Sequence, residues 1–219
     1  MILTFDIGTT AVKAALFGED MRLLAGESVE YQLLAPGNAW VELEPRVYWE
    51  GMGECMGRLL TRRPEAADRV RAIGVTTQGE TLIPVDAAGR PLRNAIVWLD
   101  GRADREAETI RSRWDAGDFY AGTGIPDCNG LCPVSKLLWI RKNEPEVHRE
   151  TRKYLLLEDY ILWRLTGRFV TEKSLLSTTG YFDIARDRYW DEMLESIGLD
   201  PALLPEALEC GDPVGPLLP

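Results

Sequence analysis

Cysteine and histidine, which cross-link small secreted proteins or bind metals, are scarce in this chain. Only four cysteines occur among 219 residues, Cys55, Cys128, Cys132 and Cys210. That number is too small for a disulfide framework in a chain of this length, and no second Cys or His pair completes a zinc set with Cys128 and Cys132. We therefore expect free thiols in a reducing compartment. The single histidine, His148, lies in a polar helical context that favours a surface position over a catalytic one.

Positive charge and long apolar runs are also in short supply. Lys and Arg number 25 against 35 Asp and Glu, which gives a formal net charge of −10. Nucleic acid and anionic lipid both need a basic face, so neither is expected as a partner. No apolar stretch is long enough to span a membrane, and the start lacks the basic region of a signal peptide. With 45% hydrophobic and 27% charged residues, the composition predicts a globular protein of the cytoplasm.

The common nucleotide-binding motifs are missing too, but the first seventeen residues offer another kind of phosphate site. Neither a GxxxxGK[ST] loop nor a GxGxxG after the first strand is present. Instead, the apolar run Ile2–Phe5 ends at Asp6, the turn Gly8–Thr10 follows, and a second apolar run covers Ala11–Phe17. This pattern predicts two antiparallel strands joined by a tight turn.

The turn has the chemistry of a phosphate and metal site. Glycine lets the backbone approach a ligand closely, and the amides and hydroxyls of Thr9 and Thr10 can donate to phosphate oxygens. Asp6 could hold a hydrated Mg²⁺ beside those phosphates. The alternative is an ordinary hairpin closed by an Asx-type turn.

The rest of the chain alternates strand and helix patterns without internal repeats or low-complexity linkers. After a third strand the segment Ala35–Trp40 is expected to be a loop, and Arg71–Thr76 a buried strand. Further strands are expected at Arg22–Val29, Leu82–Val85 and Ala95–Trp98. Helices are expected at Pro45–Leu60, Ala103–Trp114, from Pro133 onward, Leu155–Trp163 and Trp190–Ile197. Gly167 and Gly198 are expected to close the last two of these helices. The order predicts one α/β domain: a mixed sheet that opens with an antiparallel meander, and flanking helices.

Three acids follow the ends of predicted strands, namely Asp6, Glu80 and Asp100. Ligands collect at the carboxyl ends of strands in open α/β sheets, so we expect all three to line one cleft. Glu80 and the Gln78 amide could hydrogen-bond the hydroxyls of a polyol, the alternative being a solvated turn acid. Asp100 followed by Arg102 offers either hydroxyl recognition or a structural ion pair.

Four segments, in this order and spacing, resemble the FGGY carbohydrate kinases, the group of glycerol kinase and xylulokinase. They are Asp6–Thr10 (DIGTT), Thr77–Thr81 (TQGET), Ala95–Arg102 (AIVWLDGR) and Pro133–Ile140 (PVSKLLWI), and Leu157–Tyr160 and Arg164–Gly167 fit the same pattern. The resemblance covers residues 1–219 and is to the N-terminal, sugar-binding domain. It implies the actin/hexokinase-like (ribonuclease H-like) fold.

By this resemblance the activity is ATP-dependent phosphorylation of a hydroxyl on a sugar or polyol, of pentulose or polyol type, with Mg²⁺. The candidate residues then fall into three groups: Asp6 as the catalytic residue that helps place Mg²⁺; Gly8, Thr9 and Thr10 at the ATP phosphates; and Gln78, Gly79 and Glu80, with Asp100, at the sugar.

Three departures from the family pattern leave the acceptor open. Gly79 stands where the glycerol-specific pattern has Arg, and Glu80 where the xylulokinase pattern has His. Leu131 replaces the aromatic residue often found before the Pro-x-x-Lys motif. The identity of the sugar or polyol, the phosphorylated hydroxyl and the oligomeric state, a homodimer included, stay open.

The family's catalytic base is an Asp in a Gly-Asp-Asn or Gly-Asp-Gln context, which this chain lacks. Its one similar residue, Asp212, is followed by Pro213 and is expected to be structural. We therefore expect a C-terminal kinase domain as partner, and weak sugar binding without turnover by these residues alone. The alternatives are a non-catalytic sugar-sensing or interaction module that retains the fold, and a chaperone or filament protein of the wider actin-like group. The last explains neither the Thr77–Thr81 loop nor the Pro-x-x-Lys helix.

Overall fold

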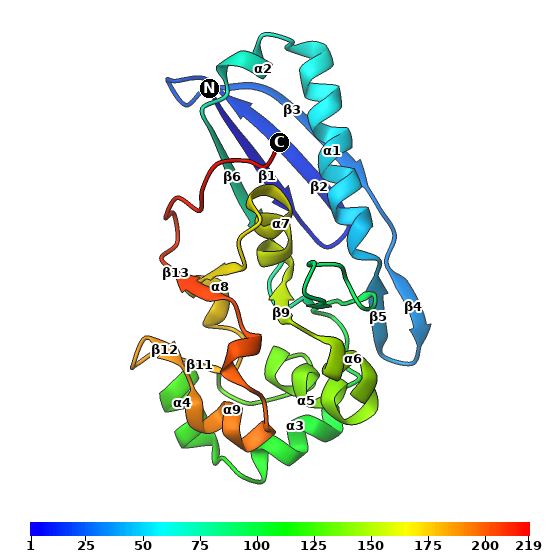
Figure 1. Ribbon diagram of the computed structural model, residues 1–219, viewed down its shortest axis with the longest axis vertical. Coiled ribbons are helices and arrows are strands. Elements are labelled where there is room, and N and C mark those ends of the chain that lie inside the picture. The colour runs from blue at the N-terminus through cyan, green and yellow to red at the C-terminus, as the bar shows by residue number, and fades with distance from the viewer. The chain divides into compact units, whose positions relative to one another are not determined.

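The computed structural model describes every residue from Met1 to Pro219, and the chain folds into two compact units (Figure 1). Unit 1 consists of residues 1–33 and 44–78, and unit 2 of residues 34–43 and 79–219. The single domain expected from the sequence is thus organised as two units.

Unit 1 is a four-stranded mixed sheet with helices. Its elements are β1 (Ile2–Ile7), β2 (Ala11–Phe17), β3 (Leu23–Glu30), α1 (Pro45–Arg62), α2 (Ala66–Arg69) and β6 (Ala72–Thr77). The strand order is β3-β2-β1-β6. The first three strands are antiparallel neighbours and β6 runs parallel to β1, which confirms the opening meander and the mixed sheet.

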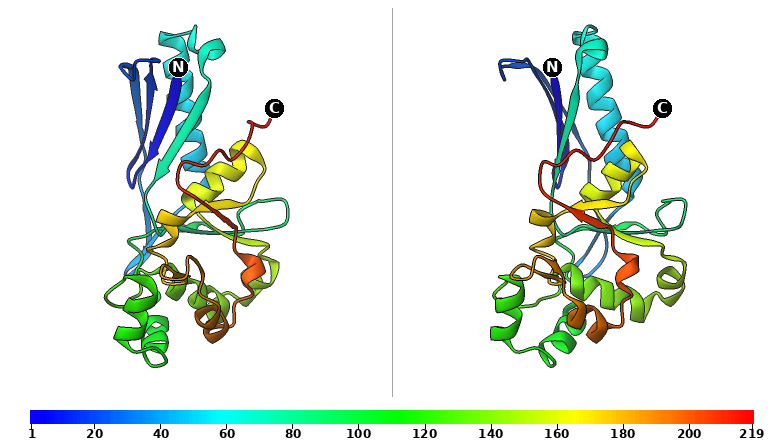
Figure 2. Two further views of the ribbon diagram at one scale, coloured as in Figure 1. Left: turned by 90° about the vertical axis from the view of Figure 1, so that its left-hand side faces the viewer. Right: turned by 60° about the vertical axis from the view of Figure 1, so that its left-hand side comes forward.

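Helix α1 runs along one face of this sheet (Figure 2). In β2, Val12, Ala14 and Leu16 are buried while Lys13 between them is exposed, the period of two expected for a half-covered strand. The buried stripe of α1 recurs every three to four residues, at Tyr48, Met52, Cys55 and Leu59. A Cβ at Gly51 would lie 3.2 Å from Val12, so glycine permits this close approach of helix and strand.

The prediction of a buried strand at Arg71–Thr76 is wrong in its burial. Strand β6 forms, but its residues alternate between exposed and half-buried. It lies at the edge of the sheet and is hydrogen-bonded only to β1. The β-branched composition of this segment therefore indicates strand conformation without indicating where the strand lies in the sheet.

Unit 2 is built on a five-stranded antiparallel sheet of order β4-β5-β8-β7-β9. These strands are β4 (Leu34–Gly37), β5 (Trp40–Leu43), β7 (Leu82–Val85), β8 (Ala95–Ile96) and β9 (Lys153–Leu156). The helices are α3 (Asp104–Arg111), α4 (Ala116–Thr123), α5 (Pro133–Asn143), α6 (Pro145–Glu150), α7 (Leu157–Thr166), α8 (Lys173–Leu176), α9 (Asp191–Ile197) and the 3₁₀ helix η1 (Pro201–Leu203). Two strand pairs complete it: β10 (Val170–Glu172) with β13 (Glu206–Leu208), and β11 (Phe182–Asp183) with β12 (Arg188–Tyr189).

Several local expectations hold and others fail. Gly167 and Gly198 close α7 and α9 in the left-handed conformation, with φ of 75° and 63°, as predicted. The segment Ala35–Trp40, expected to be a loop, instead forms most of the β4–β5 hairpin. Helix α4 was not expected, although Asp115 caps it by accepting a hydrogen bond from the Asp118 amide at 2.9 Å.

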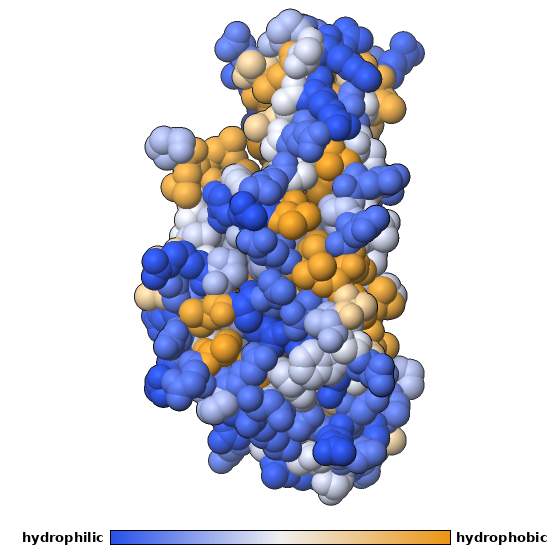
Figure 3. Space-filling model, turned by 90° about the vertical axis from the view of Figure 1, so that its right-hand side faces the viewer, coloured by the Kyte–Doolittle hydropathy of each residue, from blue (hydrophilic) through white to orange (hydrophobic).

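Helix α5 is the most buried helix of unit 2. Its first eight residues, Pro133 to Ile140, are all buried. With eleven residues it is still short, and no helix of the chain is both long and apolar enough to cross a membrane. The face in Figure 3 is hydrophilic over much of its area, with apolar side chains in separate patches. His148 is half-buried rather than fully on the surface, because its Nδ1 lies 2.8 Å from the Tyr154 hydroxyl.

Candidate active site

The turn after β1 presents an accessible carboxylate. Asp6 lies near the end of β1 opposite Lys13 of β2, and the Lys13 ammonium is 3.4 Å from its Oδ2 atom. The Asp6 side chain is 49% exposed and that of Lys13 is 66% exposed. Solvent screens such a pair, so it stabilises the fold little and leaves the carboxylate open to a cation.

The turn is held by backbone hydrogen bonds and by Tyr31. The Gly8 amide donates to the Ala11 carbonyl at 2.9 Å, and the Tyr31 hydroxyl donates to the Gly8 carbonyl. Burial raises the pKa of Tyr31, so its hydroxyl remains a donor. Because the Gly8 amide is engaged, donors to a phosphate would come from Thr9 and the exposed Thr10. A Cβ at Gly8 would approach only the Ala11 oxygen, so this side of the turn is open.

Gln78 follows β6, the strand parallel to β1. Its backbone amide donates to the Ile7 carbonyl at 2.9 Å, and its side-chain Nε2 donates to the Tyr48 hydroxyl at 3.0 Å. The side-chain oxygen Oε1 is buried and has no hydrogen-bond partner. A buried acceptor without a partner is unfavourable, and a ligand hydroxyl would satisfy it.

Glu80, the second residue of the longer segment of unit 2, combines a strained backbone with a half-buried carboxylate. Its φ is 62°, in the left-handed region that non-glycine residues seldom adopt. Burial raises the pKa of its carboxyl group, while the charge of Lys136 and the hydroxyl of Thr178 act in the opposite direction. A conformation of this kind persists only where neighbouring groups hold it in place.

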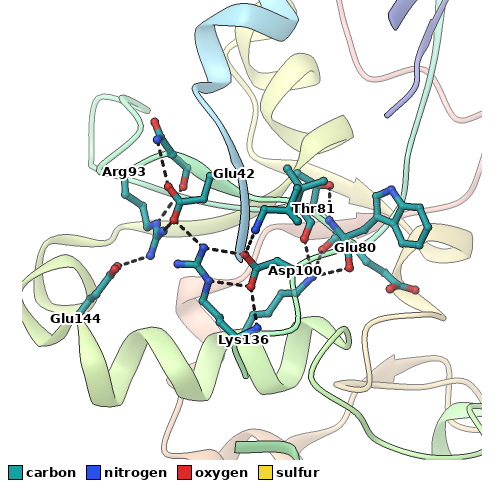
Figure 4. Close-up of polar contacts among 12 residues, drawn as sticks. Glu42, Glu80, Thr81, Arg93, Asp100, Lys136 and Glu144 are labelled. Carbon is teal, nitrogen blue, oxygen red and sulfur yellow. Dashed lines mark hydrogen bonds and ion pairs between the residues drawn. The ribbon is translucent and has the colours of Figure 1, made fainter. Parts of the chain in front are cut away.

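The group that holds the Glu80 backbone is Lys136 of α5. Its fully buried ammonium donates to the carbonyls of Glu80, Val97 and Trp98 at 3.3, 3.1 and 3.2 Å. Burial lowers its pKa to about 8, against the attraction of Asp100 and Glu80. Figure 4 shows the side chain reaching from α5 to the segments that carry Glu80 and Asp100. Lys136 therefore ties the loop after β6 to the segment after β8.

Asp100 is engaged on both of its carboxylate oxygens. Oδ1 accepts from the Arg102 amide and Nε at 3.0 and 2.8 Å, and Oδ2 accepts from Arg102 Nη2 at 2.7 Å and from the Val41 amide at 2.5 Å. Neither the Asp100 nor the Arg102 side chain is exposed. Of the two alternatives for this pair, the geometry favours the structural ion pair, and a contact of Asp100 with sugar stays a prediction.

A wider cluster surrounds this ion pair. Arg102 Nη2 also lies 2.7 Å from Glu42 of β5, and its guanidinium stacks 4.0 Å from the Trp40 ring and 4.9 Å from the Trp139 ring. Arg93 bridges Glu42 and Glu144, as Figure 4 shows. Sequence reasoning missed these partners of Arg102 and Arg93. The adjacent acids Glu42 and Glu44 were the one available signal.

The candidate residues are thus distributed over both units. Asp6, Gly8, Thr9, Thr10 and Gln78 belong to unit 1, whereas Gly79, Glu80 and Asp100 belong to unit 2. Pairing of β1 with β6 sets Asp6 beside Thr76, so Asp6, near the end of β1, and Gln78, just after β6, lie on neighbouring parallel strands. A single cleft lined by Asp6, Glu80 and Asp100 stays a prediction.

The donor set at the turn suits Mg²⁺ in one specific way. No group of three or more His, Cys, Asp or Glu side chains in the chain could hold a metal. Mg²⁺ usually keeps several waters and binds through one or two carboxylates plus substrate phosphates, a pattern that a lone exposed Asp6 fits. The Asp212 side chain is exposed, and its carboxylate accepts a 3.3 Å hydrogen bond from the Glu209 amide. All four cysteines are free thiols.

Comparison with known proteins gives the family. The model of the N-terminal domain of the FGGY family of carbohydrate kinases matches residues 1–219. This chain belongs to that family. A glycerol kinase from Thermococcus gammatolerans is 34% identical over 220 residues, which cover 98% of this chain and 44% of that protein. A xylulose kinase from Escherichia coli is 30% identical over 222 residues, covering 100% and 44%.

A solved FGGY structure shows the same fold. The crystal structure of a "xyloylose kinase" from Brucella ovis superposes with a TM-score of 0.93 at 28% identity, over 99% of this chain and 45% of that one. The actin/hexokinase-like fold implied by the resemblance is therefore confirmed. The chain spans a little under half the length of these relatives.

Proposed function

We propose that these residues are the sugar-binding part of a kinase that transfers a phosphoryl group from ATP to a hydroxyl of a sugar or polyol. The observation that supports this best is the Glu80 loop. A carboxylate with raised pKa lies there on a strained backbone, and the carbonyl of the same residue accepts a 3.3 Å hydrogen bond from the buried ammonium of Lys136. Strain of this kind gathers at ligand-binding positions.

In the proposed site, hydrogen-bond acceptors on the protein recognise the hydroxyl groups of the ligand. Glu80 and the unpartnered Gln78 oxygen would each accept from a ligand hydroxyl. A site whose polar groups are left unpaired by an analogue lacking the hydroxyl discriminates strongly against that analogue. Relatives named for glycerol and for xylulose are similar to this chain to about the same degree. We accordingly propose polyols and pentuloses as the substrate class.

The turn of unit 1 would serve the nucleotide. Asp6 would hold a hydrated Mg²⁺, and Thr9 and Thr10 would donate to phosphate oxygens. When bound, Mg²⁺ would neutralise charge that develops on the transferred phosphoryl group. Lys13 would balance the Asp6 carboxylate until the cation arrives.

The substrate hydroxyl also needs a proton acceptor, and no residue described above supplies one. Asp212 is exposed and carries neither a buried partner nor the expected sequence context. We infer that a C-terminal kinase domain, of the size by which the relatives exceed this chain, contributes that base. Residues 1–219 alone would then bind a sugar or polyol weakly without turning it over.

The test is ATP-dependent phosphorylation by the native gene product that contains these residues, across polyols, pentuloses and aldonic acids. We expect ADP release with at least one polyol or pentulose and a loss of most of the sugar affinity in Glu80→Gln. Glu195→Gln, at an exposed acid of α9, is the matched control and should leave the activity unchanged. Turnover by residues 1–219 alone would overturn the inferred base. Sugar binding without phosphorylation by the gene product would favour a non-catalytic sensing module instead.

A further inference from the structure

Unit 2 contains a cavity that none of the candidate active-site residues lines. Its volume is about 210 Å³. The end of α3, the start of α4 and the loop between α4 and α5 surround it. Pockets that hold drug-sized ligands begin at roughly 300 Å³, so a cavity of this size suits a smaller molecule.

The wall of this cavity is mainly apolar. Ile110 of α3 and Phe119 of α4 line it, and both are almost fully buried in the core of unit 2. The Trp114 indole lines it between the two helices. Its Nε1 donates to Ser196 Oγ at 3.3 Å, and its ring lies 4.6 Å from the Trp190 ring, so the indole is held on two sides. A wall of this kind favours a branched or aromatic hydrocarbon group of a ligand.

Two side chains of opposite charge border the same cavity. Arg111, the last residue of α3, and Asp127, in the loop after α4, both line it and are exposed. Nη1 of Arg111 donates to the Cys128 carbonyl, which holds the guanidinium at the cavity. The guanidinium and the Asp127 carboxylate form no ion pair with each other or with another side chain. Each charge is therefore available to a ligand.

We propose that this cavity binds a free α-amino acid with an apolar side chain, such as leucine or phenylalanine. The carboxylate of the amino acid would bind the Arg111 guanidinium, whose geometry matches a carboxylate, and the ammonium would bind Asp127. The apolar side chain would lie against Ile110, Trp114 and Phe119. A phosphorylated sugar would meet this apolar wall and the repulsion of Asp127. A simple carboxylic acid would leave Asp127 without a partner.

Calorimetric titration of the native gene product with leucine and phenylalanine tests the proposal without any measurement of activity. We expect at least one of them to bind, and two analogues of leucine to bind about tenfold more weakly than leucine itself. Leucinamide lacks the carboxylate and 4-methylpentanoate lacks the ammonium, while both keep the apolar group. Absence of binding by either amino acid at millimolar concentration overturns the proposal. Equal binding of 4-methylpentanoate and leucine also overturns it, because the site would then recognise a carboxylic acid.

Variants show whether the amino acid binds in this cavity. Asp127→Asn changes an exposed side chain and should no longer distinguish leucine from 4-methylpentanoate. Ala116→Phe should abolish binding, because Ala116 of α4 lines the cavity and a phenyl group there would fill it. Glu108→Gln, at an exposed acid of α3 outside the lining, is the matched control and should bind leucine as the wild type does. Wild-type behaviour of either cavity variant, with the fold checked by circular dichroism, overturns the assignment.

Discussion

Each unit of this chain carries an acid–base pair near the end of a strand, and the two pairs differ in burial. In unit 1 the Asp6–Lys13 pair is 3.4 Å long and both side chains are about half exposed or more. In unit 2 the Asp100–Arg102 pair is 2.7 Å long and neither side chain is exposed. An aspartate paired with a basic residue is therefore open to solvent in unit 1 and fully buried in unit 2.

Burial determines whether the carboxylate of such a pair can exchange its basic partner for another cation. An exposed pair costs little to break, so its carboxylate can exchange an ammonium partner for a cation. A buried pair has lost its hydration and must keep its partner, which makes it part of the framework. Glu80 lies between these extremes, half-buried and with a raised pKa, as expected for a group that binds a neutral polyol.

The largest expected effect comes from breaking the buried pair. Arg102→Ala leaves Asp100 buried without its ion-pair partner and should lower the free energy of unfolding by about 3–5 kcal/mol, measured by urea denaturation. Arg46→Ala, which removes exposed pairs with Glu44 and Glu50, is the control and should stay within about 0.5 kcal/mol. Equal losses in both variants would contradict the structural assignment of the cluster.

Removal of the buried ammonium should come next in size. Lys136→Ala removes a hydrogen-bond donor from three carbonyls and should cost about 2–4 kcal/mol of unfolding free energy. Sugar affinity of the gene product should fall as well, because the Glu80 loop loses its anchor. Lys142→Ala, at an exposed lysine of the same helix, provides the comparison. A cost no greater than that of Lys142→Ala would show that Lys136 does not hold the loop.

A pH dependence should arise from Glu158 in the first turn of α7. Burial and the nearby Glu172 raise its pKa to about 7, and it also repels Asp159. Between the ordinary carboxyl pKa and 7, the folded state keeps a proton that the unfolded state has released, so stability falls as pH rises through this window.

Glu158→Gln removes the loss of stability that ionisation of Glu158 causes, and it should raise the melting temperature by roughly 3 °C at pH 8. The gain should shrink towards pH 5, where the folded wild type keeps its proton. Thermal unfolding followed by circular dichroism at both pH values checks this. A gain of equal size at pH 5 and pH 8 would point to a cause other than titration of Glu158.

The smallest effect on stability is expected at the exposed pair. Lys13→Ala should change the free energy of unfolding by no more than about 0.5 kcal/mol. It should nevertheless strengthen Mg-ADP binding, because the ammonium that pairs with Asp6 no longer competes with the cation. A stability loss comparable to that of Arg102→Ala would erase the difference between the two units.

The sequence predicted features that depend on near neighbours. The β1–β2 turn, the start of α5 at Pro133 and the glycine caps at Gly167 and Gly198 follow from local spacing and backbone preference. Helix α4 was not predicted, because its two internal glycines disfavour a helix and outweigh the Asp115 N-cap as a sequence signal. The candidate residues were found by motif.

The residues that surround the candidate site residues could not be predicted from motifs. Glu42 and Arg102 lie 60 positions apart, and Lys136 lies 56 positions from Glu80. No local pattern encodes which distant partner a charged group meets, and the Val41 amide that donates to Asp100 lies 59 positions away in the sequence. For the same reason β6 could be identified as a strand but not as an exposed edge.

The central claim is that Asp6 serves the nucleotide and Glu80 serves the sugar. It is tested most directly by calorimetric titration of the native gene product with Mg-ADP and, separately, with its accepted polyol or pentulose. We predict that Asp6→Ala weakens Mg-ADP binding about tenfold or more while sugar binding is unchanged, and that Glu80→Gln does the reverse. Sugar binding that survives Glu80→Gln at wild-type affinity would contradict the account.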